Sequence, residues 1–332
     1  MNITKPKKLE NEDIVRAIAP ANSFSRYKPE VLEIGKKWFE NKGIKLEFGK
    51  NAFKACGHAA GTIEERLEDF HSAFENKQVK AIIGIGGFNS HQLLEYIDWK
   101  TVKKNPKVFC GFSDITALNN AILAKAGLAN FSGPSFSTFC QPKPFKFSEE
   151  FFEKIVMKGE SNIELKPSDF WAEDQWRDKP LDAERELQKN PGWKVFKEGK
   201  AKGQVFGGNA STLVLLLGTE YFPKLKEKIL FIEDDYEAKP WHFDRYMTQL
   251  RQAGVLEKIK GLVVGRFETA SGFNENDSLE MILKDALKGI DIPVITGIDI
   301  GHTDPILTIP LGINCRIDTA KPEISFMESA VE

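Results

Sequence analysis

The chain has 332 residues, of which 41% are hydrophobic and 28% are charged. This composition excludes a disordered tail, and the length predicts about two domains. The 46 basic and 48 acidic residues give a net charge of −2, without the basic excess that binding to a phosphate backbone requires. We therefore expect a globular protein whose partners include no nucleic acid polymer.

Cysteine spacing and apolar runs indicate the compartment. No CxxC pair occurs, which predicts reduced thiols rather than a disulfide framework or a zinc site. The lysines at 5, 7 and 8 are not followed by the apolar stretch of a signal peptide, and the longest apolar run, 213–217, is too short to span a bilayer. We expect a cytoplasmic protein with no membrane partner. The four cysteines are Cys56, Cys110, Cys140 and Cys315.

Short apolar runs alternate with helical patterns from residue 14 onward, which is typical of strand–helix–strand units and a parallel sheet. Thr62 followed by Glu65 has the form of a helix-capping box. Residues 1–140 are predicted to form an N-terminal α/β domain. In chain order we expect a strand at 15–21, a helix at 29–41, a strand at 45–48, a helix at 62–74, a strand at 81–87, a helix at 92–96, a strand at 107–110 and a helix at 115–126.

The composition changes after residue 140. Residues 141–200 are rich in proline and charge and hold three of the six tryptophans, Trp171, Trp176 and Trp193. We interpret this part as a linker with a surface excursion over 170–195. Residues 201–332 are strand-rich, with helical patterns at 211–218, 242–254 and 278–288. They predict a C-terminal domain of mixed, mostly β structure, so that the fold class is α/β.

The segment Val108–Thr116 takes an apolar strand into a helix through a tight turn. Gly111 stands two residues before Ser113, as in turns that lift a serine hydroxyl to the edge of a parallel sheet. Free N–H groups at the helix start would face whatever the hydroxyl attacks. Helix capping by Ser113 or Asp114 explains the same residues. The sequence alone favours capping, because Ile115 stands where a nucleophile elbow carries its second glycine.

A serine nucleophile needs a base, and the chain offers five histidines. His71 falls inside a helical pattern and His91 opens a helix, so both are typical packing or surface residues. His58 and His242 remain weaker alternatives. His302 lies in a turn between two apolar strands, where a side chain can face a cleft. A solvent-exposed turn histidine remains the competing interpretation.

Three acids, Glu233, Asp234 and Asp235, follow the apolar run 228–232. A carboxylate at the end of a buried strand needs a partner, and orienting a histidine is one such use. The same cluster could hold Mg²⁺ or form a solvated turn, so the acids alone decide nothing.

Two glycine clusters follow strands. The backbone of 84–90, with Gly86 and Asn89, could approach a ligand closely and donate N–H groups to it. It is no dinucleotide fingerprint, because Asn89 occupies the place of the third glycine. For this cluster, and for Gly207 and Gly208, tight packing is the competing interpretation.

Taken in order, seven segments resemble the LD-carboxypeptidase family of serine peptidases, which includes the microcin C immunity carboxypeptidases. The resemblance covers nearly the whole chain. The segments are AIAPANS (17–23), AGTIEERLEDFHSAF (60–74), AIIGIGGFNSHQLLEYIDW (81–99), GFSDITAL (111–118), GGNASTL (207–213), ILFIED (229–234) and GHTDPILTIPLG (301–312).

The resemblance implies a Rossmann-like N-terminal half and a mostly β C-terminal half, with the active site at their junction and commonly a homodimer. It assigns the nucleophile to Ser113, the acid to Glu233 and the base to His302. The oxyanion hole falls on the backbone N–H groups of Gly87 and Asp114. A serine carboxypeptidase of this kind needs no metal and no cofactor.

Within the family, some members release D-alanine from murein tetrapeptides, and the microcin-type members cleave an amide between an aminoacyl group and a nucleotide-like moiety. The excursion resembles the tryptophan-bearing one of the microcin type. Indole stacking on a base contributes about 1–3 kcal/mol, although tryptophans that merely fasten the loop explain the sequence equally well. We expect the small peptide or peptidyl-nucleotide substrate to contact Gly86, Asn89, Trp171 and Trp176.

Two other classes of function remain open. The first is a metal-dependent hydrolase that uses Glu233, Asp234, Asp235 and His302. The second is a non-catalytic module that captures a peptide or nucleotide at Gly86 and Gly87.

Overall fold

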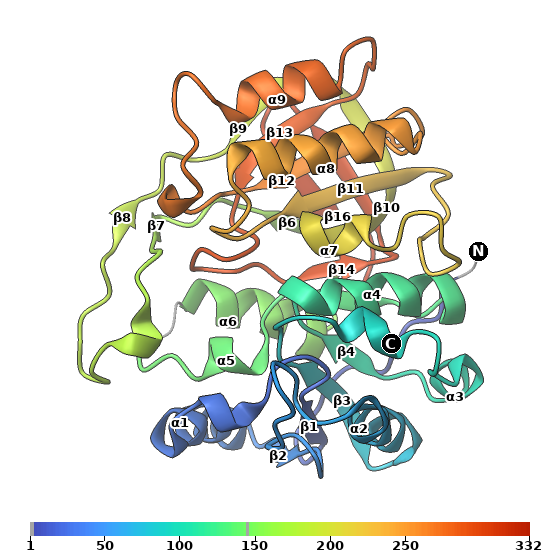
Figure 1. Ribbon diagram of the computed structural model, residues 1–332, viewed down its shortest axis with the longest axis vertical. Helices are drawn as coiled ribbons and strands as arrows, with labels where there is room; N and C mark the ends of the chain where they lie inside the picture. Colours follow the sequence, from blue (N-terminus) through green and yellow to red (C-terminus); the bar gives the residue numbers. More distant parts are fainter. Residues whose placement is uncertain (1–2, 144–145) are drawn as a thin grey trace.

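The computed structural model describes residues 3–143 and 146–332, and it contains two large sheets, one in each half of the molecule (Figure 1). The α/β fold class is confirmed: a mainly parallel sheet lies in the N-terminal half and a mixed sheet in the C-terminal half. In the described part of the chain, no helix is long and apolar enough to cross a membrane.

The first sheet has six strands, five of them parallel, as the continuous apolar runs predict. The sixth strand comes from the far end of the chain: β14 pairs antiparallel with β5. The sequence interpretation had included β14 in the C-terminal domain. In sheet order the strands are β14 (Ile309–Leu311), β5 (Asn130–Ser132), β4 (Val108–Cys110), β3 (Val79–Gly84), β1 (Ile14–Ile18) and β2 (Lys45–Phe48).

The second sheet has eight strands, with four parallel strands in its centre and antiparallel strands at both edges. A separate two-stranded sheet joins β7 (Phe170–Trp171) to β8 (Gln188–Lys189) at the base of the excursion. In sheet order the eight strands are β6 (Ile163–Leu165), β16 (Glu323–Phe326), β15 (Asn314–Asp318), β10 (Lys200–Asn209), β11 (Lys228–Glu233), β12 (Gly261–Gly265), β13 (Val294–Ile298) and β9 (Lys194–Lys197).

Segment 141–200 is more than the linker and surface excursion that its composition suggested. Two of its strands, β6 and β9, close the two edges of the second sheet. Both strands are short and hold only two apolar residues each, Ile163 and Leu165 in β6 and Val195 and Phe196 in β9. Two apolar positions are too few to mark a strand in the sequence. The domain boundaries at 140 and 200 stay predictions.

Helices flank both sheets, with α8 and α9 beside the second sheet and α4 between the two halves (Figure 1). The helix at 29–41 and the strand at 45–48 are confirmed at the predicted bounds, and Thr62 and Glu65 form the predicted capping box of α2. The α-helices are α1 (Pro29–Asn41), α2 (Ile63–Glu75), α3 (Trp99–Lys104), α4 (Thr116–Ala121), α5 (Phe136–Phe139), α6 (Lys146–Phe152), α7 (Ala210–Val214), α8 (Pro240–Gln252) and α9 (Leu279–Ala286).

Two predicted helices take other forms. The helix expected at 92–96 is a single 3-10 turn, η2 (Ser90–Leu93), which follows a left-handed Asn89. The helix expected at 115–126 is divided into η3 (Ser113–Ile115), α4 and the π-helical η4 (Ile122–Ala126). Further short helices are η1 (Phe24–Arg26), η5 (Glu153–Met157), η6 (Trp176–Asp178) and η7 (Thr269–Ser271).

The two halves meet through a glycine pair. The amide of Asn120 on α4 exchanges hydrogen bonds with the backbone of Gly207 on β10, at 2.9 and 3.2 Å. A Cβ atom on Gly208 would lie 2.4 Å from Oγ1 of Thr116. This confirms close packing for the second glycine cluster, and it places the start of α4 against β10.

Candidate active site

Ser113 is the first residue of η3, directly after the turn that follows β4. Its φ is +62°, in the left-handed region that costs a non-glycine residue about 1–2 kcal/mol. The residue at the helix N-cap is Phe112, so Ser113 does not cap the helix. Ile115 fits where a second glycine was expected, because its side chain packs against Gly84 and Gly111 instead. The capping interpretation is therefore wrong for Ser113.

His302 faces Ser113 from the loop between β13 and β14. Its Nε2 lies 3.1 Å from the Ser113 Oγ, and its Nδ1 lies 2.9 Å from Oε2 of Glu233. The ring of Phe112 packs edge-on against the imidazole at 5.1 Å between centroids. With Nδ1–H donating to the carboxylate, Nε2 is left to accept the serine proton.

Glu233 ends the buried central strand β11, and its side chain is 4% exposed. Two glycines leave room for it: a Cβ on Gly265 would lie 2.7 Å from its Cβ, and one on Gly301 would lie 2.4 Å from its Oε2. The strand register places Asn209 opposite Glu233. Gly301 belongs to the loop that carries His302, so its close approach sets the Glu233 carboxylate beside that loop.

The acids around His302 control its charge. Burial lowers the pKa of His302, but the attraction and hydrogen bond of Glu233, with Asp235 and Asp234, outweigh burial and raise it to about 9. The imidazolium is therefore well stabilised in this site. A histidine whose positive charge is favoured can accept a proton readily during the reaction.

The segment 84–90 lies against Ser113. A Cβ on Gly86 would lie 3.0 Å from the Ser113 Cβ, and Gly87 has a φ of +152° with Asn22 packed against its Cα. The N–H of Asp114, in the first turn of η3, has no acceptor within its own helix. The carboxylate of Asp114 accepts hydrogen bonds from the N–H groups of Asn89 and Ser90, at 3.0 and 2.7 Å, and so holds the glycine segment beside the serine.

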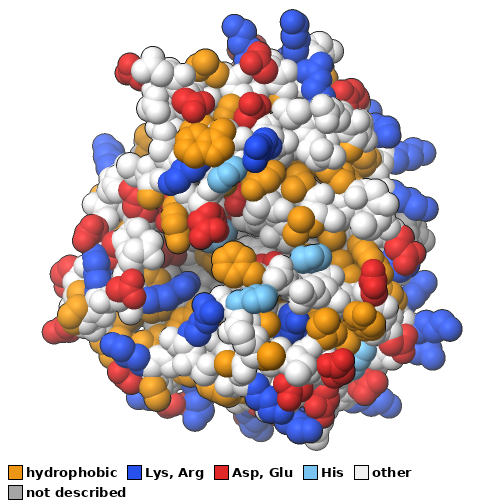
Figure 2. All heavy atoms as spheres, in the orientation of Figure 1, with side chains coloured by type: hydrophobic (Ala, Val, Ile, Leu, Met, Phe, Trp, Pro, Cys, Tyr) orange, Lys and Arg blue, Asp and Glu red, His pale blue; other side chains and the backbone are white. Residues whose placement is uncertain are grey.

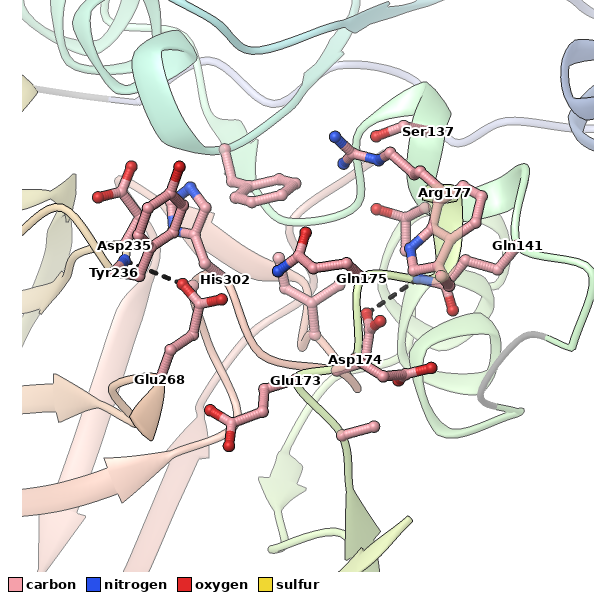
Figure 3. A pocket seen from close by; sticks show the side chains of 17 residues that line it. Ser137, Gln141, Glu173, Asp174, Gln175, Arg177, Asp235, Tyr236, Glu268 and His302 are labelled. Atoms are coloured by element: carbon pink, nitrogen blue, oxygen red, sulfur yellow. Dashed lines mark hydrogen bonds between the residues drawn. The ribbon is translucent and has the colours of Figure 1, made fainter. Parts of the chain in front are cut away.

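A cavity of about 170 Å³ opens beside His302. The molecular face that contains it is hollowed near its centre (Figure 2). His302, Asp235 and Glu268 lie toward one side of the cavity, and Arg177 and Gln141 lie toward the other (Figure 3).

The four predicted substrate contacts do not lie together. Trp176 lines the same cavity as His302, whereas Trp171 lies under the guanidinium of Arg266 in a second cavity. Gly86 packs on Ser113, and the Asn89 amide pairs with His58. The structure thus brings Trp176 and Gly86 to the site and leaves Trp171 outside it.

The three acids after β11 point to different partners. Glu233 binds His302, while the buried Asp234 accepts from the Asn209 amide and the Ser211 N–H, both at 2.9 Å. Burial, with Glu233 and Asp235, raises the pKa of Asp234 to about 7. Within 3–143 and 146–332, no group of three or more His, Cys, Asp or Glu side chains is placed to hold a metal ion.

Two charged residues of the cavity escaped the sequence interpretation. Glu268 is 7% exposed, accepts from the Tyr236 N–H at 2.9 Å and has its pKa raised by burial to about 7. Arg177 stacks over the rings of Tyr27 and Trp176. Neither stands in a recognisable motif, and only the three-dimensional fold brings them into the cavity that His302 lines.

Comparison with known proteins identifies the family of the chain. Residues 15–133 match the model of the LD-carboxypeptidase N-terminal domain, and residues 202–317 match that of the LD-carboxypeptidase C-terminal domain. The putative carboxypeptidase YocD of Bacillus subtilis is 41% identical over 94% of this chain and 95% of its own length. A probable murein peptide carboxypeptidase of the same organism is 32% identical over 96% and 92%.

Immunity proteins of the microcin type are similar as well. The Escherichia coli microcin C7 self-immunity protein MccF is 33% identical over 89% of this chain and 87% of its own. The crystal structure of an MccF-like protein from Bacillus anthracis has a TM-score of 0.91 and 37% identity, covering 97% of this chain and 99% of that one. MccF in complex with aspartyl sulfamoyl adenosine also has a TM-score of 0.91, at 30% identity over 99% and 100%. The resemblance noted in the sequence is confirmed: the chain belongs to the LD-carboxypeptidase family and is a serine-type carboxypeptidase.

Proposed function

We propose that this carboxypeptidase cleaves its amide bond through Ser113, His302 and Glu233, with an acyl-enzyme intermediate. The observation that carries the proposal is the continuous chain of hydrogen bonds from Ser113 Oγ through both ring nitrogens of His302 to Glu233. Such a chain is the geometric signature of an activated serine nucleophile. The positive φ of Ser113 supports it, because strain of this kind is typical of a nucleophile elbow.

In the proposed mechanism, His302 Nε2 takes the Ser113 proton while the oxygen attacks the amide carbonyl. The N–H groups of Gly87 and Asp114 stabilise the oxyanion. His302 then donates the proton to the leaving amine, and Ser113 remains acylated. A water molecule, deprotonated by His302, attacks the ester and regenerates the serine. Glu233 stabilises the imidazolium in both halves of the reaction.

For the substrate we propose an aminoacyl or peptidyl nucleotide. Trp176 in the cavity wall supports this choice, since an indole face can stack on a nucleobase. The similarity to MccF, whose structure holds aspartyl sulfamoyl adenosine, supports it as well. A murein tetrapeptide is the second candidate, supported by the similarity to the probable murein peptide carboxypeptidase.

One assay tests both parts of the proposal. The enzyme and its Ser113→Ala variant are incubated with a murein tetrapeptide and with an aminoacyl sulfamoyl adenosine, and the products are identified by mass spectrometry. We expect cleavage of the second substrate and a loss of several orders of magnitude in Ser113→Ala. Unchanged turnover in that variant eliminates the mechanism, and release of D-alanine alone assigns the murein substrate.

Two further proposals come from the sequence: the homodimer from the family resemblance, and the location from the cysteine spacing and the short apolar runs. We propose a homodimer, which sedimentation equilibrium of the purified protein tests. We also propose a cytoplasmic location, which fractionation of the producing cell tests.

A further inference from the structure

The excursion, residues 170–195, is fastened beside the active site by one buried guanidinium. The side chain of Arg185 is 7% exposed, and that of Asp174 is 1% exposed. Arg185 Nε donates to both Asp174 oxygens, at 2.9 and 3.1 Å. Its Nη1 donates to Oε1 of Gln141, and its Nη2 to Oδ2 of Asp304, each at 2.8 Å. One side chain thus joins three acceptors from three parts of the chain.

Asp304 belongs to the loop that carries His302 and follows His302 by two residues. Its second oxygen accepts from the Gln141 amide at 2.9 Å. Its backbone exchanges two hydrogen bonds with Ala172 in the excursion, both at 2.8 Å. Within the described residues, these two are the only hydrogen bonds to other backbone groups that the backbone of residues 301–305 makes. The backbone of 301–305 is therefore held by the excursion, while the His302 ring is held by Glu233.

The hydrogen bonds of Arg185 to Asp174, Gln141 and Asp304, here called the clamp, also fix part of the cavity wall. The Asp174 carbonyl oxygen accepts from the Trp176 N–H at 2.7 Å, and Trp176 lines the cavity of His302. Asp174 and Gln141 line the same cavity (Figure 3). The wall and the histidine loop consequently share one anchor.

We propose that Arg185 is a positioning residue for catalysis, which holds the His302 imidazole in line with Ser113 by joining Asp174 of the excursion to Asp304. The proposal rests on the proposed role of His302 as the base. A misplacement of about 1 Å between reacting groups can lower a rate about 100-fold. Since the backbone of the histidine loop makes only the two hydrogen bonds between Asp304 and Ala172, its position depends on the bonds of Arg185 to Asp304 and Asp174. The planar guanidinium suits this task, because its five N–H groups reach several acceptors in fixed directions, which an ammonium group cannot do.

The experiment compares conservative variants with a matched control. Arg185→Lys keeps the positive charge but loses the planar guanidinium with its several N–H donors. Asp304→Asn keeps the shape of the side chain but weakens its ion pair with Arg185. Lys143→Met is the control, because Lys143 also binds the excursion, through Glu184, but does so on the surface and away from Asp304. For each protein we measure kcat, KM and the thermal midpoint, using the substrate that the native enzyme cleaves.

We expect kcat to fall about 10- to 100-fold in both clamp variants, with Lys143→Met within a factor of two of the native enzyme. The double variant Arg185→Lys/Asp304→Asn should lose no more than the worse single variant, because both changes break the same bridge. An unchanged kcat in Arg185→Lys and Asp304→Asn overturns the proposal, even if the thermal midpoint falls or KM rises. If Ser113→Ala is inactive in parallel, that outcome leaves the proposed mechanism intact and rejects only the clamp.

Discussion

The hydroxyl of Thr116 accepts a hydrogen bond from the backbone N–H of Asn209 at 2.9 Å. Thr116 opens α4, three residues after the serine, and Asn209 ends β10 opposite Glu233. This contact therefore links the turn that bears the nucleophile to the strand neighbour of the acid. The site depends on the fit between the two halves as much as on its own side chains.

The fit can be disturbed at Gly208. In Gly208→Ala the new Cβ would meet the Thr116 Oγ1 at 2.4 Å, in a backbone of φ +130°, so α4 and β10 must separate. We expect a loss of roughly 1–3 kcal/mol in the free energy of unfolding and a lower kcat. Urea unfolding and turnover assays measure both quantities.

Gly218→Ala is the matched control for this change. Gly218 also has a positive φ, of +80°, but nothing lies within 4 Å of its Cβ position. It should therefore show the backbone strain without the clash, and keep its kcat. Equal losses of kcat in the two variants would contradict the proposed fit between the halves.

Glu233→Gln should keep the fold and lose most of the activity. An amide can donate to the Nδ1 of His302 and thereby favour the wrong tautomer, an effect that lowers kcat about 10⁴-fold in a serine triad of the same type. The neighbouring acid Glu237 is exposed and serves as a control in Glu237→Gln. A kcat for Glu233→Gln within tenfold of the native value would show that the carboxylate does not orient the base.

The pH dependence should report His302. Its pKa is raised to about 9, and a general base acts in its neutral form. We expect kcat/KM to rise with pH from 6 toward 9 and then level off, since kcat/KM reports ionisations of the free enzyme. In Glu233→Gln the rising limb should move to lower pH, because the main source of the upward shift is gone. A profile that is flat from pH 6 to 10 is incompatible with this assignment.

Local signals in the sequence predicted their own structures well. The helix at 29–41 begins with a proline in its first turn, and Thr62 caps α2 with Glu65, so each signal acts within one or two helical turns. Such elements depend little on the rest of the chain, and their bounds agree with the prediction within one residue.

Elements that depend on distant partners could not be predicted in this way. The short strand β14 pairs with β5 although nearly the whole second half of the sequence separates them. Arg185 and Asp304 are ordinary charged residues until the fold buries them together. The sequence interpretation of Ser113 as a cap failed for a related reason, because the glycines that accommodate Ile115 lie on two different strand ends.

Trp176 offers a test of substrate class. Its indole lines the cavity of His302, and stacking on a base contributes about 1–3 kcal/mol. Trp176→Ala should therefore raise KM for an aminoacyl sulfamoyl adenosine about 5- to 150-fold and change KM for a murein tetrapeptide much less. Trp171→Ala is the control, because Trp171 lies in the second cavity under Arg266 and should leave both constants nearly unchanged. If Trp176→Ala raises KM by the same factor for both substrates, the indole only shapes the wall of the cavity and does not stack on a nucleobase.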